Sequence, residues 1–170
     1  MYYDTPDLGL YSNGLSLRVQ PVKAGYEQTL KLELQPEGDA VLTRLECCDN
    51  ISAPEPSWEA VTAPEAQAAV KPFRDKSLVH IFTSAIERRS FEMEVQSGAV
   101  EVAFDVGKLI LAGGVKQQDF SEIEIELKRG SVGSIEAVKQ EILRLAPSAT
   151  IQPQSKSVQG SRLYLRHQSN

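Results

Sequence analysis

The sequence is poor in the residues that build sulfur-based metal sites and disulfide frameworks. Only two of its 170 residues are cysteines and two are histidines. Cys47 and Cys48 are adjacent, so a strand would point them to opposite faces, and they fit no CxxC spacing. We therefore expect neither a zinc site nor a disulfide framework. His80 and His167 stand alone in the chain, which favours structural or surface roles over ligation or base catalysis.

Long apolar runs and an excess of positive charge are missing as well. No run is long enough to cross a bilayer, and the first residues lack the basic and apolar regions of a signal peptide, so we expect a cytoplasmic protein with no membrane partner. The formal net charge is −5, which argues against a nucleic-acid partner. Hydrophobic residues make up 41% and charged residues 24%, as in ordinary globular proteins, and the length predicts a single domain over 1–170.

What the sequence does contain is alternation of polar and apolar residues, the pattern of half-buried antiparallel strands. A turn is expected at 36–39, and a helix is expected from Ser134, a candidate N-cap, until Pro147 stops it. The tail after this helix is short and basic. The sequence therefore predicts the α+β class, with mostly antiparallel strands and a few helices. The alternating segments are 15–20, 26–34, 41–48, 86–96, 99–106 and 120–130.

The most regular of these segments is 120–130, FSEIEIELKRG. Glu122, Glu124 and Glu126 alternate with aliphatic residues, so one face of the strand is acidic and the other apolar. A solvated acidic face is one interpretation. Three carboxylates in line on a rigid strand are also suitable ligands for a hard divalent cation.

The polar faces of the strands carry charges of both signs. One interpretation is a sheet with one wet face, on which such residues form solvated pairs of small energy, and the pattern alone favours it. The other is a sheet curled into a barrel with this face inward, where Arg and Lys bind polyanionic oxygens and the carboxylates hold a metal. The cations are Arg18, Lys31, Arg44 and Arg88, and the anions are Glu46, Asp105, Glu122, Glu124 and Glu126.

Six segments carry a family resemblance through their order and spacing. They are YYDTPDLGLYSNGLSLRVQ (2–20), TLK (29–31), TRLE (43–46), AFDVG (103–107), SEIEIELKRG (121–130) and QSKSVQGSRL (154–163). Together they resemble the CYTH domain, the triphosphate tunnel metalloenzyme superfamily, and are most similar to its bacterial inorganic triphosphatase branch. The resemblance covers essentially the whole chain.

The resemblance implies an antiparallel eight-stranded β-barrel that forms a tunnel, with a triphosphate-bearing small molecule inside and Mg²⁺ or Mn²⁺ as cofactor. The implied reaction is metal-dependent hydrolysis of inorganic triphosphate or a related triphosphate by attack of water on a terminal phosphoryl group. The implied catalytic residues are Glu46, Asp105, Glu122 and Glu124. The implied phosphate-binding residues are Arg18, Lys31, Arg44, Arg88 and Lys156. The implied metal ligands are Asp105, Glu122, Glu124 and, more weakly, Glu126.

The sequence also departs from the family pattern. The family opens with a strand carrying Glu-x-Glu-x-Lys, whereas this sequence begins after it. We therefore expect an incomplete barrel with weak or no hydrolysis, or a homodimer formed through the open sheet edges. Gln20 and Gln159 stand where Arg is common. The alternative function is a catalytically weak module that binds triphosphate or polyphosphate. Thiamine triphosphate hydrolysis and adenylate cyclisation rank lower, because they need a pocket for an organic group and Trp58 is the only tryptophan.

Overall fold

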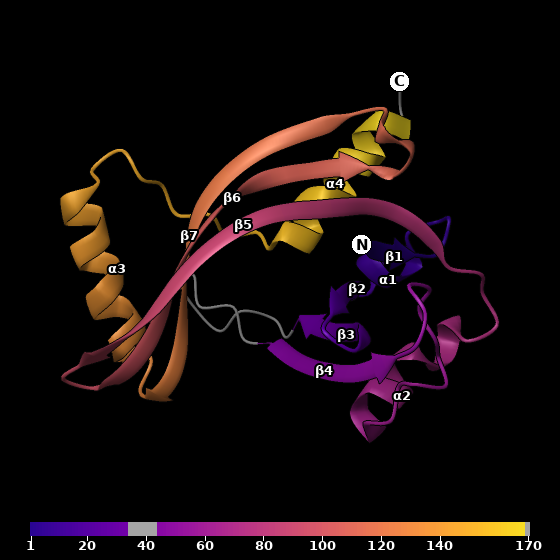
Figure 1. Ribbon diagram of the computed structural model, residues 1–170, viewed down its shortest axis with the longest axis horizontal. Helices are drawn as coiled ribbons and strands as arrows, with labels where there is room; N and C mark the ends of the chain where they lie inside the picture. The colour runs from indigo at the N-terminus through magenta and orange to yellow at the C-terminus, as the bar shows by residue number, and fades with distance from the viewer. Residues whose placement is uncertain (34–43, 169–170) are drawn as a thin grey trace. The chain divides into compact units, whose positions relative to one another are not determined.

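The computed structural model describes residues 1–33 and 44–168, and it consists mainly of strands with a few short helices (Figure 1). The α+β class with an antiparallel sheet is confirmed. The expected turn at 36–39 and the expected strand residues at 34 and 41–43 lie outside the described residues. The strands are β1 (Tyr2–Asp4), β2 (Leu15–Val22), β3 (Gly25–Glu33), β4 (Arg44–Ile51), β5 (Val79–Val95), β6 (Gly98–Leu111) and β7 (Gln117–Gly130). The helices are α1 (Gly9–Ser12), α2 (Pro64–Val70), α3 (Gly133–Leu145) and α4 (Lys156–Gln168), with 3-10 turns η1 (Lys71–Phe73) and η2 (Ala112–Gly114).

The described strands follow the order β4-β3-β2-β1-β5-β6-β7 in one sheet, with β4 and β7 at the two ends of that order. They number seven, where the resemblance implied eight. The antiparallel register of β2 with β3 places Ser16 opposite Lys31 and Arg18 opposite Thr29. The register of β3 with β4 places Lys31 opposite Glu46. Alternation within each strand therefore brings polar side chains of three neighbouring strands onto one face.

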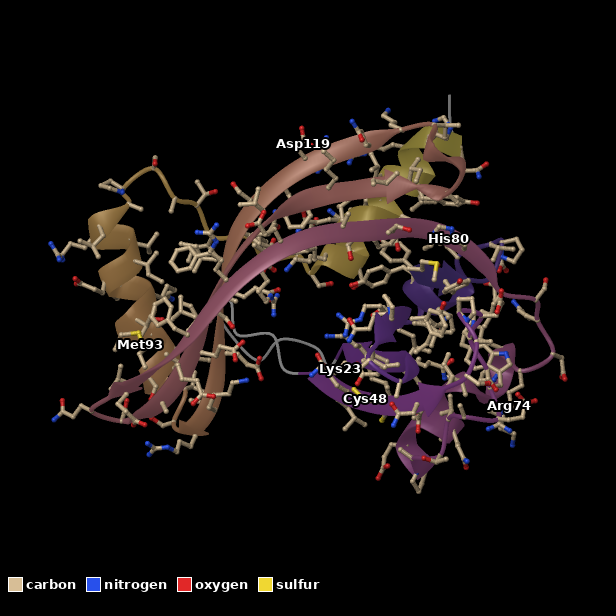
Figure 2. All side chains as sticks on the ribbon, viewed as in Figure 1. Lys23, Cys48, Arg74, His80, Met93 and Asp119 are labelled. Carbon is tan, nitrogen blue, oxygen red and sulfur yellow. The ribbon has the colours of Figure 1, made fainter. Side chains whose placement is uncertain are left out.

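The chain divides into two compact units. The first comprises Met1–Ser84, Ile110–Lys116 and Gln154–Asn170. Its core is built by the apolar sides of β2 and β3, where Leu17 and Leu30 are completely buried, and by residues of α1, α2 and η1 that pack on them. Cys47 packs against this core, whereas Cys48, labelled in Figure 2, lies on the polar side of β4 near Thr29. The two cysteines therefore face opposite sides, as the alternation predicted.

The second unit comprises Ala85–Leu109 and Gln117–Pro153. The helix α3 packs on one face of its strands (Figure 1), and Val138 contacts the buried Val100 and Val102. Ile135 and Ile142, at helical spacing from Val138, pack against the same cluster, which confirms the expected helix.

The predicted cap of this helix is wrong. The helix begins at Gly133, its N-cap position is Val132, and no side chain caps it. Ser134 is buried, and its hydroxyl forms a hydrogen bond of 2.9 Å with the hydroxyl of Ser97. Ser97 lies in the turn between β5 and β6, so this partner was not visible from the local sequence.

The helix α4 was not predicted, because most of the residues it buries are small or polar. Ser157, Gly160 and Ser161 are buried, at a spacing that forms one helix face. Gly160 lies against the ring of Phe82, which is itself completely buried and stacks on Tyr2 with 4.4 Å between ring centroids. Close approach at Gly160 therefore packs this helix against β5 within the first unit. Among the described helices, none combines the length and the apolar character that a bilayer-spanning segment needs.

Candidate functional site

Charged side chains of the second unit meet on the face of the sheet opposite α3. Arg88 of β5 donates from Nε to Oδ1 of Asp105 on β6 and from Nη2 to Oδ2, both at 2.7 Å. The same Nη2 also donates to Oε2 of Glu124 on β7. The Asp105 side chain has no exposed surface, whereas the side chains of Arg88 and Glu124 are 42% and 45% exposed. A buried carboxylate is thus neutralised by a guanidinium at the surface, and we call these three residues with Glu122 the acidic cluster.

Electrostatics keep Arg88 charged in this arrangement. The hydrogen bonds from Arg88 to Asp105, reinforced by Glu124, raise the pKa of the guanidinium above its already high ordinary value. The bidentate geometry is the strongest form of arginine–carboxylate contact. Arg88 is therefore a fixed positive charge among the carboxylates at any physiological pH.

The acidic cluster fits a divalent metal ion by the chemistry of its donors. Asp105, Glu122 and Glu124 each offer a carboxylate oxygen, and these oxygens all lie within 4.8 Å of one another. Mg²⁺ and similar hard cations prefer oxygen ligands, and two of these three acids come from alternate positions of a single rigid strand. Asp105 comes from the neighbouring strand, so the residues are held by the sheet and not by a loop.

Glu126, the fourth expected metal ligand, is not a member of this group. Its carboxylate lies 3.2 Å from Nζ of Lys128, which in turn lies 3.4 Å from Glu101. These acids raise the pKa of Lys128, with Glu126 the largest contributor.

The first unit holds a second set of expected residues on the polar face of β2, β3 and β4. Lys31 donates from Nζ to Oε1 of Glu46, directly opposite on the neighbouring strand, at 2.5 Å. Arg18 donates from Nη2 to the hydroxyl of Thr29 at 3.4 Å. Arg18, Lys31 and Glu46 therefore lie on the same face of three paired strands.

Two buried polar atoms on this face have no hydrogen-bond partner among the described residues 1–33 and 44–168. They are Nε of Arg18 and the hydroxyl oxygen of Ser16, which point to the same side of β2 from alternate positions. Ser16 and Thr29 were not among the residues expected from sequence. Each lies two residues before an expected site residue, Arg18 or Lys31, and so shares the polar side of its strand with that residue.

The remaining expected residues also belong to the first unit. Lys156 is the first residue of α4 and is buried. Arg44 begins β4, where its backbone pairs with Glu33. The structure thus groups Arg18, Lys31, Arg44, Glu46 and Lys156 in the first unit and Arg88, Asp105, Glu122, Glu124 and Glu126 in the second.

The fold and these residues define a class of protein: an antiparallel sheet with cations on the polar side of its strands in the first unit and, in the second unit, a carboxylate cluster able to hold a metal ion. The chain belongs to the CYTH domain family, which it matches over residues 1–161. The resemblance stated from the sequence is thereby confirmed.

Two proteins illustrate the relationship. The chain is 36% identical over 138 residues to the inorganic triphosphatase of Haemophilus influenzae, a match that covers 77% of this chain and 36% of that protein. The chain therefore spans little more than a third of this relative's length. Its structure is also similar to a crystal structure from Bacillus halodurans, provisionally described as an adenylate cyclase, with a TM-score of 0.52 and 19% identity over 91% of this chain and 76% of the other. At that identity the likeness concerns the fold alone.

Proposed function

We propose that this protein hydrolyses a triphosphate-bearing small molecule, with inorganic triphosphate as the preferred substrate and Mg²⁺ or Mn²⁺ as cofactor. Membership of the CYTH domain family and similarity to an inorganic triphosphatase support the reaction class. The observation that carries the proposal is the acidic cluster, in which three carboxylates and one arginine converge on rigid strands. Such a cluster suits a reaction in which the protein and a metal ion neutralise the negative charge of phosphate oxygens and form no covalent intermediate.

The cations would bind the phosphate oxygens. A triphosphate carries several negative charges on oxygens that a guanidinium contacts through two parallel hydrogen bonds and an ammonium contacts as a point charge. In the first unit the paired strands place Arg18 and Lys31 on one face, and Nε of Arg18 still has a hydrogen bond to donate. The proposed phosphate-binding residues are Arg18, Lys31, Arg44, Arg88 and Lys156.

The carboxylates would hold the metal ion and orient water. Asp105, Glu122 and Glu124 are the proposed ligands, with Glu126 as a further candidate and Glu46 as a fourth catalytic carboxylate. When bound, the ion supplies positive charge that neutralises phosphate oxygens. The transition state of phosphoryl transfer is loose, so positioning and charge neutralisation by these side chains account for most of the expected acceleration.

Phosphate release from inorganic triphosphate in the presence of Mg²⁺ tests the proposal. Lys31→Ala removes a proposed phosphate contact and is expected to lower kcat/KM at least about tenfold, the loss typical of a charged hydrogen bond. The matched control is Lys139→Ala, which removes a lysine paired with Glu136 on the surface of α3 and should retain full activity. Equal activities of the two variants would contradict the assignment of Lys31.

The alternative function gives a different result in the same experiment. A module that only binds triphosphate would show a higher melting temperature with triphosphate and Mg²⁺ but no phosphate release. Thiamine triphosphate and ATP, tested in parallel, report whether an organic group is accepted. No melting shift with any of the three compounds would leave the charged face as a solvated surface.

Two further expectations remain proposals. Because β4 and β7 end the sheet order, a second copy of the chain could pair with an edge, and light scattering after size exclusion would report the mass of such a homodimer. The second expectation is that the protein is located in the cytoplasm.

A further inference from the structure

One guanidinium nitrogen occupies the place where two proposed metal ligands converge. Nη2 of Arg88 lies 2.7 Å from Oδ2 of Asp105 and is also hydrogen-bonded to Oε2 of Glu124. Nε of the same residue contacts the other oxygen of Asp105, so both oxygens of this buried carboxylate accept from Arg88. Arg88 therefore does for these two acids what a bridging divalent ion would do: it supplies positive charge between them.

A metal ion and this nitrogen cannot bridge the same pair of oxygens together. Mg²⁺ lies about 2.1 Å from its oxygen ligands, and Nη2 lies 2.7 Å from Oδ2 of Asp105, so an ion bound to that oxygen would lie less than about 5 Å from Nη2. A double and a single positive charge at that distance repel each other strongly. The arginine can yield, because its side chain is 42% exposed and has solvent to move into. Asp105 cannot, because its side chain is wholly buried.

We propose that Arg88 is a built-in counter-cation of the acidic cluster, which bridges Asp105 and Glu124 in the metal-free protein and releases Glu124 when a divalent ion binds. Asp105, a buried carboxylate, then has a positive partner in both states. Release frees one arm of the guanidinium for phosphate oxygens, so the ion would prepare the anion site as it binds. This last step rests on the proposed function, whereas the competition between Arg88 and the ion does not.

The test measures Mn²⁺ affinity without any phosphate compound, by calorimetry and by electron paramagnetic resonance of free Mn²⁺. Arg88→Gln removes the competitor and is expected to bind Mn²⁺ roughly fivefold tighter or more, since an ion pair of about 1 kcal/mol no longer has to be broken. Arg88→Lys keeps the charge but loses the two-armed fork, so it should bind about twofold tighter or more. Circular dichroism and melting curves show that each variant is folded.

The matched control is Arg89→Gln. Arg89 is the next residue of β5, and its Nη2 lies 3.4 Å from Glu87 rather than in the acidic cluster. The substitution removes the same charge from the same strand, so a change of less than about twofold in Mn²⁺ affinity shows that position, and not net charge, determines the effect.

Weaker or unchanged Mn²⁺ binding by Arg88→Gln and Arg88→Lys would overturn the proposal, because it would mean that Arg88 holds the ligands in place. Absence of Mn²⁺ binding by the unaltered protein would overturn it too. Phosphate release from triphosphate is measured on the same preparations. A preserved Arg88 effect without hydrolysis refutes the proposed function alone, and hydrolysis without the Arg88 effect refutes this inference alone.

Discussion

Gly160 of α4 is the position where a rule of helix stability and the packing of this protein give opposite predictions. Replacing glycine by alanine in a helix interior ordinarily stabilises it by about 0.5–1 kcal/mol. A Cβ on Gly160, however, would lie 2.2 Å from Cζ of Phe82 and 2.4 Å from both Cε atoms. Carbon atoms in ordinary contact lie about 3.5–4.0 Å apart, so the ring or the helix would have to move by more than about 1 Å.

The clash should decide the sign of the effect. Phe82 is completely buried and stacks on Tyr2, so its ring has no free space into which it can turn. Overpacking of this kind costs about 1–3 kcal/mol, which exceeds the gain in helix propensity. Gly160→Ala is therefore expected to lower the free energy of unfolding by about 1–2 kcal/mol. For a chain of this length that corresponds to a fall of roughly 2–8 °C in melting temperature.

Melting followed by circular dichroism measures the effect, with Gly133→Ala as the control. Gly133 is the first residue of α3, and the nearest atom to its added Cβ would be the side-chain oxygen of Ser131 at 3.3 Å, which can rotate away. This variant should melt no lower than the unaltered protein. The double variant Gly160→Ala with Phe82→Leu should lose less stability than the sum of the single variants. A melting temperature of Gly160→Ala equal to or above that of the unaltered protein would refute the packing assigned to α4.

Two other predictions concern buried polar groups of the first unit. Ser16→Ala removes a buried hydroxyl without a partner, so the melting temperature should stay constant or rise, and a fall of more than about 3 °C would contradict this account. Burial raises the pKa of Asp4 above its ordinary value of 3.8, although three backbone N–H groups oppose the shift. The folded protein therefore binds the proton of the Asp4 carboxyl group more tightly than the unfolded chain does. Protonation of Asp4 stabilises the fold at low pH, and this stabilisation is lost as pH rises from 3.8 through the raised pKa. Asp4→Asn abolishes this titration. The free energy of unfolding, measured in urea, should therefore fall for the unaltered protein relative to the variant as pH rises from about 3 to 7. A difference between the two proteins that does not change with pH would contradict the assignment of the raised pKa to Asp4.

Most strands could be predicted because period-two alternation is a local property of the sequence. The expected segments 26–34 and 120–130 correspond to Gly25–Glu33 and Gln117–Gly130 within a few residues. Alternation also predicts which side chains share a face. It says nothing about register, so neither the Lys31–Glu46 pair nor the contacts of Arg88 with Asp105 and Glu124 followed from it.

The elements that sequence reasoning missed depend on partners distant in the chain. The helix α4 places Gly160 against Phe82, which is far away in sequence, and most of the other residues it buries are small or polar. The sequence therefore contains no stripe of large apolar residues from which this helix could be predicted. Ser134 bonds to Ser97 across the unit instead of capping its own helix. The buried hydroxyl of Ser16 has no hydrogen-bond partner in the described part of the chain, which could not be predicted without the positions of the residues around it.

The most direct test of the central claim is phosphate release from inorganic triphosphate with Mg²⁺ by the unaltered protein and by Glu122→Gln. The substitution keeps the size of a side chain in the acidic cluster and removes one negative charge. The account predicts turnover by the unaltered protein and a loss of at least about tenfold in kcat for the variant, because fewer carboxylates hold the ion. Equal turnover by the two proteins would contradict it.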